Sequence, residues 1–320
     1  MKKRVLSMVL VCLLAFSAAA CGKDGGTQGG QTTDRADATD RTDAAQGTES
    51  GADEPEEGST QPVWVEPEKE EPAIDWSAVE TAPDEDFYFD EVTIDGIEGI
   101  EIRFYRGENN VVKVPETYDG KPIISIHREA FQKDVTDVYI ETESFLHVQG
   151  YAFKGCDDLN SVVIIAGEES YMGDLVFYEC ESLTSVVLSE EFVHFGYHTF
   201  SYTPWLENKR QENPLVILNY VVVDGTRCTG DVVIPDGVIG IGENAFEMNK
   251  DITSLTLPDS VRRIDEGAFI YCTGLTGINL PDDIEDYGLN AYTDCKDIVI
   301  TYQGKEYTYE DLSELHNIFY

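Results

Sequence analysis

The sequence predicts a repeat solenoid, mostly of short β-strands joined by short irregular or 3-10 return arms, with about 23 residues per unit and a cap at each end. The first observation is a series of aromatic residues spaced by 22 to 24 residues, with one gap of 46: Phe131, Phe153, Phe177, Phe200, Phe246, Phe269 and Tyr292. The second is an aliphatic residue six positions after most of them: Leu159, Leu183, Leu206, Ile252, Leu275 and Ile298. The third is a proline at the same 23-residue interval: Pro235, Pro258 and Pro281. Because such a fold offers extended surface, the repeat favours a binding protein over an enzyme.

The first 20 residues have the pattern of a bacterial export signal. Basic residues at 2–4 precede an apolar stretch over 5–20 that is too short for a stable membrane span. The stretch ends in Ala18-Ala19-Ala20-Cys21, which resembles the lipobox of bacterial lipoprotein signals. The resemblance implies cleavage before Cys21, lipidation of its sulfur, and attachment to the membrane through that lipid alone. An ordinary secretory signal that leaves Cys21 as a free thiol is the alternative, and either places the mature protein outside the cytoplasm.

Residues 21–86 are expected to form a disordered, acidic tether that begins at the lipidated cysteine. The segment is rich in Gly, Thr, Asp, Glu, Gln and Pro and has hardly any aliphatic residues, so it cannot bury a core. Trp64, Ile74 and Trp76 are isolated apolar residues there, and we expect them to stay solvated. The whole chain carries a formal charge of −40, which repels nucleic acid and argues against that class of partner.

The folded part is predicted to begin at residue 87, where the composition changes. Apolar and polar residues alternate over 92–94 and 100–104 as in half-buried strands, and residues 111–115 have the pattern of a first rung. Together they suit an N-terminal cap to a solenoid that extends over 87–302. In the clearest repeats, 238–258 and 261–281, each unit ends in a short strand, and the Ala-Phe block before it suits a tight return arm with the ring pointing inward.

This pattern closely resembles the BspA-type leucine-rich repeat family of bacterial surface lipoproteins over about residues 111–302. Two copies carry the Ala-Phe-x-x-Cys core of that family, at residues 152–156 and 268–272. Three others drift from it, at Val176-Phe177, Thr199-Phe200 and Ala291-Tyr292. The resemblance implies a right-handed solenoid with parallel strands on one face.

Two segments depart from the repeat. Residues 203–206 break the pattern, residues 215–223 have the pattern of a β-hairpin around Asn219-Tyr220, and residues 231–235 return to the register. This interruption, residues 203–235, is either a variant rung, which we favour, or a protruding hairpin that shapes a binding surface. After residue 302 the period stops, and residues 303–320 predict a C-terminal cap of one strand and a short helix. Leu312, Leu315 and Phe319 would then face the last rung.

Four cysteines occupy the same position of the repeat, three residues after its aromatic residue. Cys156 and Cys180 would therefore stack on neighbouring rungs, as would Cys272 and Cys295. A site outside the cytoplasm permits disulfides between them, but buried free thiols are the interpretation that we favour. No metal site is expected, because His194 and His198 lack the glutamate of a zinc protease motif and no C-x-x-C pair occurs.

The strand alternation also predicts a candidate ligand face on the repeats. The outward positions are small, polar and nearly uncharged: Tyr139, Ser161, Val163, Ser185, Val187, Ser254, Thr256, Gly277 and Asn279. No catalytic motif or cofactor-binding pattern accompanies them. The sequence therefore predicts a non-enzymatic lipoprotein for recognition or adhesion at the cell surface. It would bind a host or bacterial surface protein or a glycan, and a solute-binding lipoprotein that serves a transporter is the alternative.

Overall fold

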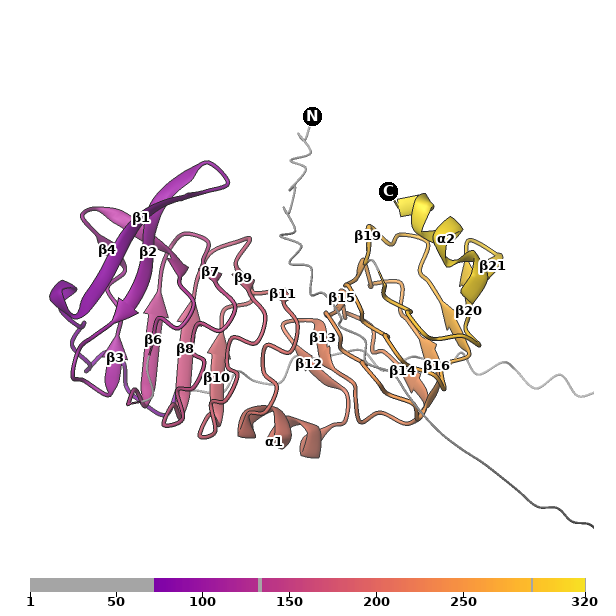
Figure 1. The fold of residues 1–320 in the computed structure, drawn as a ribbon, viewed down its shortest axis with the longest axis horizontal. Coiled ribbons are helices and arrows are strands. Elements are labelled where there is room, and N and C mark those ends of the chain that lie inside the picture. The colour runs from indigo at the N-terminus through magenta and orange to yellow at the C-terminus, as the bar shows by residue number, and fades with distance from the viewer. Residues whose placement is uncertain (1–71, 132–133, 289, 320) are drawn as a thin grey trace, which may run out of the picture. The chain divides into compact units, whose positions relative to one another are not determined.

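The computed structural model describes residues 72–131, 134–288 and 290–319, all of which belong to one unit, Gly58–Tyr320. The predicted signal peptide, Cys21 and most of the predicted tether lie outside the described residues. The described part is a β-solenoid of about nine turns with about 23 residues per turn, as predicted (Figure 1).

Each turn contributes one longer strand to a parallel sheet, and these strands form two separate sheets. The first sheet has the order β10 (Ser185–Leu188), β8 (Ser161–Ile165), β6 (Asp137–Glu141) and β3 (Val111–Lys113). The second has the order β14 (Gly230–Val233), β16 (Ile252–Thr256), β18 (Gly277–Asn279), β20 (Val299–Tyr302) and β21 (Lys305–Thr308). The strands alternate between buried aliphatic and outward residues, as Val138 and Ile140 do in β6, so stacking makes the aliphatic core continuous.

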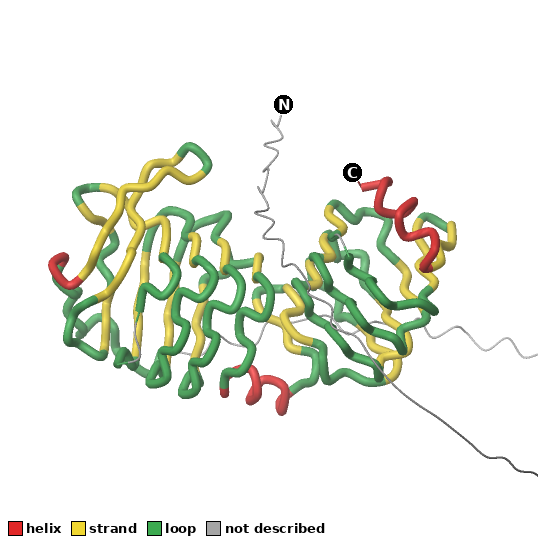
Figure 2. Tube along the Cα trace, viewed as in Figure 1, coloured by secondary structure: helices red, strands yellow, loops and turns green. Residues whose placement is uncertain are grey.

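A second set of short strands lies elsewhere on the turns, where the sequence predicted only irregular return arms (Figure 2). In the first half of the solenoid, before the interruption at residues 203–235, these are β5 (Lys121–Ile126), β7 (His147–Val148), β9 (Tyr171–Met172) and β11 (His194–Phe195). In the second half they are β15 (Gly240–Ile241), β17 (Arg263–Ile264) and β19 (Asp286–Tyr287). Most contain only two residues, which is too short for a period-2 pattern to reveal them.

The repeat aromatic residues form two stacked ladders inside the solenoid. Phe131 and Phe153 stack with ring centroids 4.9 Å apart, and the series continues through Phe177 to Phe200. In the second half Phe246, Phe269 and Tyr292 stack at 5.2 and 5.1 Å. All of these rings are buried, so the return arms turn around a continuous aromatic core.

Both caps have the predicted elements. At the N-terminal end β1 (Phe87–Ile94) and β2 (Ile97–Tyr105) form an antiparallel hairpin, β2 pairs with β5, and the short β4 (Thr117–Tyr118) joins β5. A 3-10 turn, η1 (Asp84–Asp86), precedes the hairpin. At the C-terminal end β21 folds back on β20, and η2 (Tyr309–Asp311) leads into α2 (Leu312–Phe319). Leu315 is fully buried, and Leu312 and Phe319 pack against the last rung as predicted.

The interruption contains the predicted hairpin and an α-helix that the sequence analysis missed. The helix α1 (Pro204–Glu212) begins at Thr203, whose hydroxyl accepts a hydrogen bond from the backbone N–H of Leu206 at 3.2 Å. The hairpin strands β12 (Val216–Leu218) and β13 (Val221–Asp224) pair with each other, and β13 continues in parallel into β15. Because Val216, Val221 and Val222 are buried, the hairpin is a variant rung.

Candidate functional site

The predicted ligand face is divided between two sheets. Five of its residues lie on the first sheet: Tyr139, Ser161, Val163, Ser185 and Val187. The other four lie on the second sheet: Ser254, Thr256, Gly277 and Asn279. The first sheet ends at strand β10 and the second begins at strand β14, because α1 and the β12–β13 hairpin lie between these two strands in the chain. A single continuous face across all nine residues is therefore not formed.

The expectation that Ser161 and Val163 are exposed is wrong. Ser161 is 7% exposed and donates a hydrogen bond to the carboxylate of Asp137, while Val163 is 3% exposed. Val163 lies beside Tyr139 in the register of β6 and β8, and the ring of Tyr139 lies 5.3 Å from that of Trp76. A segment before the N-terminal cap thus covers this end of the face.

That segment is held by several contacts, so the expectation that Trp76 stays solvated is also wrong. Trp76 is 6% exposed, its carbonyl accepts a hydrogen bond from Lys113 Nζ at 3.2 Å, and Ala82 N donates to the carbonyl of Lys113 at 2.8 Å. Thr81 forms a parallel bridge with Lys113. Contacts with the solenoid therefore begin before Phe87, the predicted start of the folded part. We call residues 72–83 the strap.

The second sheet keeps an open face. Thr256 and Asn279 are exposed, and Ser254 and Gly277 are half-buried. Ser254 donates a hydrogen bond to Asp231 at 2.6 Å, and a Cβ built on Gly277 would meet no atom within 4 Å. The outward residues of this sheet are thus small and solvated, as the sequence predicted, but few of them offer area for a strong contact.

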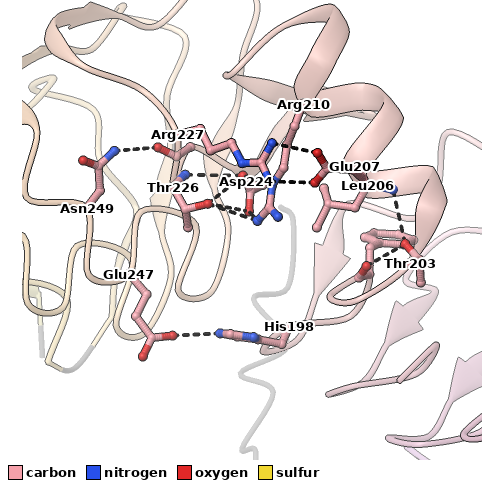
Figure 3. Close-up of polar contacts among 12 residues, drawn as sticks. His198, Thr203, Leu206, Glu207, Arg210, Asp224, Thr226, Arg227, Glu247 and Asn249 are labelled. Carbon is pink, nitrogen blue, oxygen red and sulfur yellow. Dashed lines mark hydrogen bonds and ion pairs between the residues drawn. The ribbon is translucent and has the colours of Figure 1, made fainter. Parts of the chain in front are cut away.

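A group of polar contacts lies where α1 and the hairpin meet the neighbouring turns (Figure 3). We call residues 195–249 the junction. Helix α1 presents Glu207 and Arg210 toward the segment after β13, and the turn before Phe200 presents His198 toward the second half (Figure 3). The Thr203 cap, with proline at the first helical position, sets where α1 begins and so fixes these directions.

Two arginines of the junction are committed to carboxylates. Arg210 donates from Nε to Asp224 at 3.0 Å, contacts the other Asp224 oxygen through Nη2, and donates to the hydroxyl of Thr226 at 3.0 Å. Arg227 forms a two-point ion pair with Glu207, at 2.8 and 2.7 Å. The Arg210 pair is largely buried, whereas both partners of the Arg227 pair are exposed. These contacts attach α1 to the second half of the solenoid.

Further contacts cross the interruption between residues far apart in sequence. His198 Nε2 lies 2.8 Å from a carboxylate oxygen of Glu247, and Asn219 donates hydrogen bonds to the carbonyls of Ser189 and Phe192. Arg263 donates to the carbonyl of Val193 at 2.5 Å. Hydrogen bonds and ion pairs therefore join the turns on both sides of the interruption, and the polar side chains of the junction serve mainly in these contacts.

Two hollows open at the junction. One of about 50 Å³ is lined by the apolar side chains of Phe195, Leu206 and Val223 and by polar groups that include Arg210 and Asp224. A wider one of about 540 Å³ is lined by Tyr202, Thr203, Glu207, Arg227 and their neighbours. Only the wider hollow has a volume in the range of small-molecule pockets, and most cations that line it already have a carboxylate partner.

A cluster of carboxylates with shifted acidity lies next to these hollows. Burial and the nearby charges of Asp174, Asp265 and Glu266 raise the pKa of Glu243 to about 7. Burial raises the pKa of Asp265 to about 6, although Arg263 beside it acts in the opposite direction. Among the described residues no group of three or more His, Cys, Asp or Glu side chains is arranged to hold a metal ion.

The two histidines spaced four residues apart face different partners. Burial and the charge of Arg263 lower the pKa of His194 to about 4, whereas His198 pairs with Glu247. They do not converge on a shared ligand site. In the described turns Cys156, Cys180, Cys228, Cys272 and Cys295 are buried free thiols. Burial raises the pKa of Cys180 to about 12 and that of Cys228 to about 11, which suppresses the reactive thiolate.

Sequence reasoning missed α1, the strap and the pairing partners at the junction. Thr203-Pro204 matches a helix start, with a capping hydroxyl before a proline, and that signal was available. The strap and the ion pairs had no local signal, because Lys113 and Trp76 are 37 residues apart and His198 and Glu247 are 49 apart. In the part of the chain that the structure describes, neither helix is long and apolar enough to cross a membrane.

Comparisons with known proteins found one matching family model and several solved structures with some similarity to this chain. The family model for the BspA type leucine rich repeat region matches residues 104–222 and 219–311, with six copies. A leucine-rich repeat protein from T. pallidum is 21% identical, with a TM-score of 0.38, and the match covers 75% of this chain and 97% of that one. One from Bacteroides ovatus is 22% identical, with a TM-score of 0.34, over 70% and 53% of the two chains.

A leucine-rich cell surface protein from Faecalibacterium prausnitzii is 19% identical, with a TM-score of 0.31, over 71% of this chain and 56% of that one. This chain thus spans nearly all of the first relative but only about half of the other two. The comparison with curated proteins gave no match. The family model alone covers more than half of the chain, and by that match the chain belongs to the BspA-type leucine-rich repeat family.

Proposed function

We propose that this protein is a non-enzymatic recognition or adhesion protein of the bacterial cell surface, which binds a protein or a glycan through the surface of its repeats. The observation that carries the proposal is the separation between buried core positions and outward surface positions on the turns of the solenoid. The aliphatic and aromatic positions of the turns are buried in two cores, one in each half of the solenoid, and the outward positions vary from turn to turn. This division leaves a rigid scaffold whose surface is free to suit a ligand.

The location and the anchor form part of the same proposal. The basic and apolar residues at 1–20 and the Ala-Ala-Ala-Cys sequence at 18–21 support export and lipidation at Cys21. The acidic segment that follows would then separate the repeats from the membrane surface. Mass spectrometry of the mature protein tests this directly, because an acylated N-terminal peptide beginning at Cys21 is expected.

The junction favours a second candidate, a solute-binding lipoprotein that serves a transporter. The small hollow that borders the β12–β13 hairpin through Val223 contains both apolar and polar groups, and it shares Arg210 with the wider hollow of about 540 Å³, which has room for a solute. The intramolecular pairing of Arg210 with Asp224 weighs against this candidate, since the polar groups of a solute site should be available to the solute.

The test is retention of defined surface components by the full-length protein. Mucin, extracellular-matrix and bacterial-envelope preparations are passed over immobilised protein, with heat-unfolded protein as the control. Saturable retention of an identified glycan or protein that leaves the column chemically unchanged supports recognition. Conversion of a retained component into a product would overturn the non-enzymatic assignment, and saturable binding of small solutes alone would favour the second candidate.

A further inference from the structure

A row of tyrosines crosses three successive turns of the first half, close to the aromatic ladder but outside it. Tyr151 and Tyr178 meet edge to face with ring centroids 6.3 Å apart, and Tyr178 and Tyr202 do the same at 5.7 Å. We call these three residues the tyrosine stripe. Tyr202 is 73% exposed and the other two are half-buried, so the stripe offers aromatic surface to solvent at each turn.

Cationic side chains gather at the N-terminal end of the stripe. The guanidinium carbon of Arg128 lies 4.4 Å from the centre of the Tyr151 ring, and Lys154 Nζ lies 5.7 Å from it. Both line an open hollow of about 530 Å³, together with Arg103, His127 and one carboxylate, Glu129. We call this the basic hollow. The chain has only 22 Lys and Arg against 62 Asp and Glu, so several cations around one hollow stand out from the rest of the chain.

The two cations that touch Tyr151 differ from most others on this protein. Arg103, Arg210 and Arg227 each pair with a carboxylate. Within the described residues, neither Arg128 nor Lys154 has a carboxylate at ion-pair distance, and the ring of Tyr151 is their charge-stabilising contact. A ring that holds the cations in place reduces the entropy that they lose on binding an anion.

The backbone hydrogen bonds beneath the stripe argue against a peptide that binds as an added strand. The turns that carry the tyrosines are already hydrogen-bonded to one another, as from Gly155 N to Tyr178 O at 3.0 Å and from Phe153 N to Val176 O at 3.0 Å. A peptide that adds a strand needs a free sheet edge, which this surface does not have. A sugar chain, by contrast, needs only aromatic faces for its rings and charged or polar groups for its substituents.

The net charge of the whole protein further restricts the class of ligand. A net charge of −40 repels a dense polyanion over long range, whereas the basic hollow attracts a single carboxylate at short range. We propose that the tyrosine stripe and the basic hollow together bind an acidic glycan whose carboxylates are separated by neutral sugars. This rests on the proposed recognition function and names the ligand class for one surface.

In this arrangement Arg128 and Lys154 bind a carboxylate while Tyr178 and Tyr202 contact the sugar rings that follow. Tyr202 also lines the wide hollow at the junction, so the sugar chain would run from the basic hollow toward α1. The site therefore lies on the return-arm turns and not on the predicted strand face.

The test is isothermal titration of the full-length protein with a hyaluronan octasaccharide, which has a carboxylate on every second sugar. A neutral chito-oligosaccharide of equal length, a heparin octasaccharide and a peptide with the sequence of residues 53–72 serve as comparisons. We expect the hyaluronan fragment to bind at least tenfold more tightly than the neutral one. Arg128→Gln combined with Lys154→Gln should weaken it by about tenfold, as should Tyr202→Ala.

Matched controls separate the site from general effects on charge and folding. Tyr271→Ala removes a tyrosine from the same repeat position on a distant turn, since Tyr202 and Tyr271 each follow the ladder aromatic by two residues and both have positive φ. Lys305→Gln removes another lysine that lies over a tyrosine ring. Both controls should bind like the unaltered protein, and circular dichroism should be the same for every variant.

Three results would overturn the inference: equal binding of the neutral oligosaccharide, unchanged affinity in the Arg128 and Lys154 double variant, or tighter binding of the acidic peptide or of heparin. Retention of surface components by the same preparation distinguishes the two proposals. If the stripe variants still retain them as the unaltered protein does, the glycan site is wrong and recognition stands. If the unaltered protein retains nothing, the recognition proposal fails as well.

Discussion

Single buried residues in this protein have either a repeated or a local role. The ladder aromatics and the cysteines three positions after them have the same surroundings on each turn, which is why their spacing alone identified them. Glu243 has a local role, because its neighbours come from turns on both sides of the interruption, Asp174 from one and Asp265 from the other. Charge placed among like charges in a half-buried position is a local cost to stability.

Glu243→Gln should therefore stabilise the protein, and more so at high pH. The folded pKa of Glu243 lies at about 7, above its ordinary 4.5, so between these values the folded state holds a proton that the unfolded chain releases. Stability from this group is thus lost as the pH rises through that window. We expect the variant to exceed the unaltered protein by about 2 kcal/mol at pH 8, and the difference to fall toward pH 4.5.

Urea denaturation of both proteins from pH 4.5 to 8 measures this difference. The contribution of Asp265 to stability also falls as the pH rises, since its pKa is raised. The contribution of His194, whose pKa is lowered, instead rises with pH between about 4 and 6.5. Subtracting the two stability profiles removes the contribution of His194 and the part of the Asp265 contribution that does not depend on the charge of Glu243. A difference that does not change with pH would contradict the assignment.

At the scale of elements, α1 and the hairpin decide how the two sheets are connected. Helix α1 buries Trp205 and Leu206 against the first half, and Trp205 lies 4.6 Å from Phe200 at the end of the first ladder. Its outer residues pair with the second half. The helix thus covers the end of the first aromatic ladder and also contacts the second half of the solenoid. A regular turn, which contributes a single inward ring, could not do both.

The two ion pairs of α1 should differ strongly in their effect on stability. Asp224→Asn leaves the largely buried Arg210 without its charge partner and should lower the free energy of unfolding by about 3 kcal/mol. Glu207→Gln removes an exposed partner of Arg227 and should change the free energy of unfolding far less, because solvent screens that pair. Both variants are compared in urea at neutral pH, and equal costs would contradict the difference in burial.

The strap is the other element whose contacts are easily separated from the rest. Trp76→Ala should detach it from Tyr139 without unfolding the solenoid, because Trp76 contacts Tyr139 and Lys113 at one end of the repeats and is not part of the stacked core. We expect faster protease cleavage within residues 72–83 and faster amide exchange at Val163, with an unchanged midpoint of global unfolding. Glu80→Gln, at an exposed position of the same segment, is the control and should leave both rates unchanged.

At the scale of the whole molecule, repetition explains why much of the fold could be predicted. The strands over 252–256 and 277–279, both caps and the hairpin at residues 216–224 were expected from residue patterns within single turns. The candidate ligand face was predicted less well. Alternation located its strands correctly, but Ser161 and Val163 are buried, and the face is divided between two sheets.

The sequence by itself determined the period, the buried aromatic and aliphatic positions and the capped β-solenoid. These depend on contacts between neighbouring turns, which the 23-residue repeat encodes directly. Only the tertiary structure decided that the strap covers Tyr139, that Arg263 reaches Val193, and that three tyrosines align beside Arg128 and Lys154. The physical reason is that these contacts join side chains across several turns or from outside the repeat, where no fixed spacing in the sequence records which residues meet.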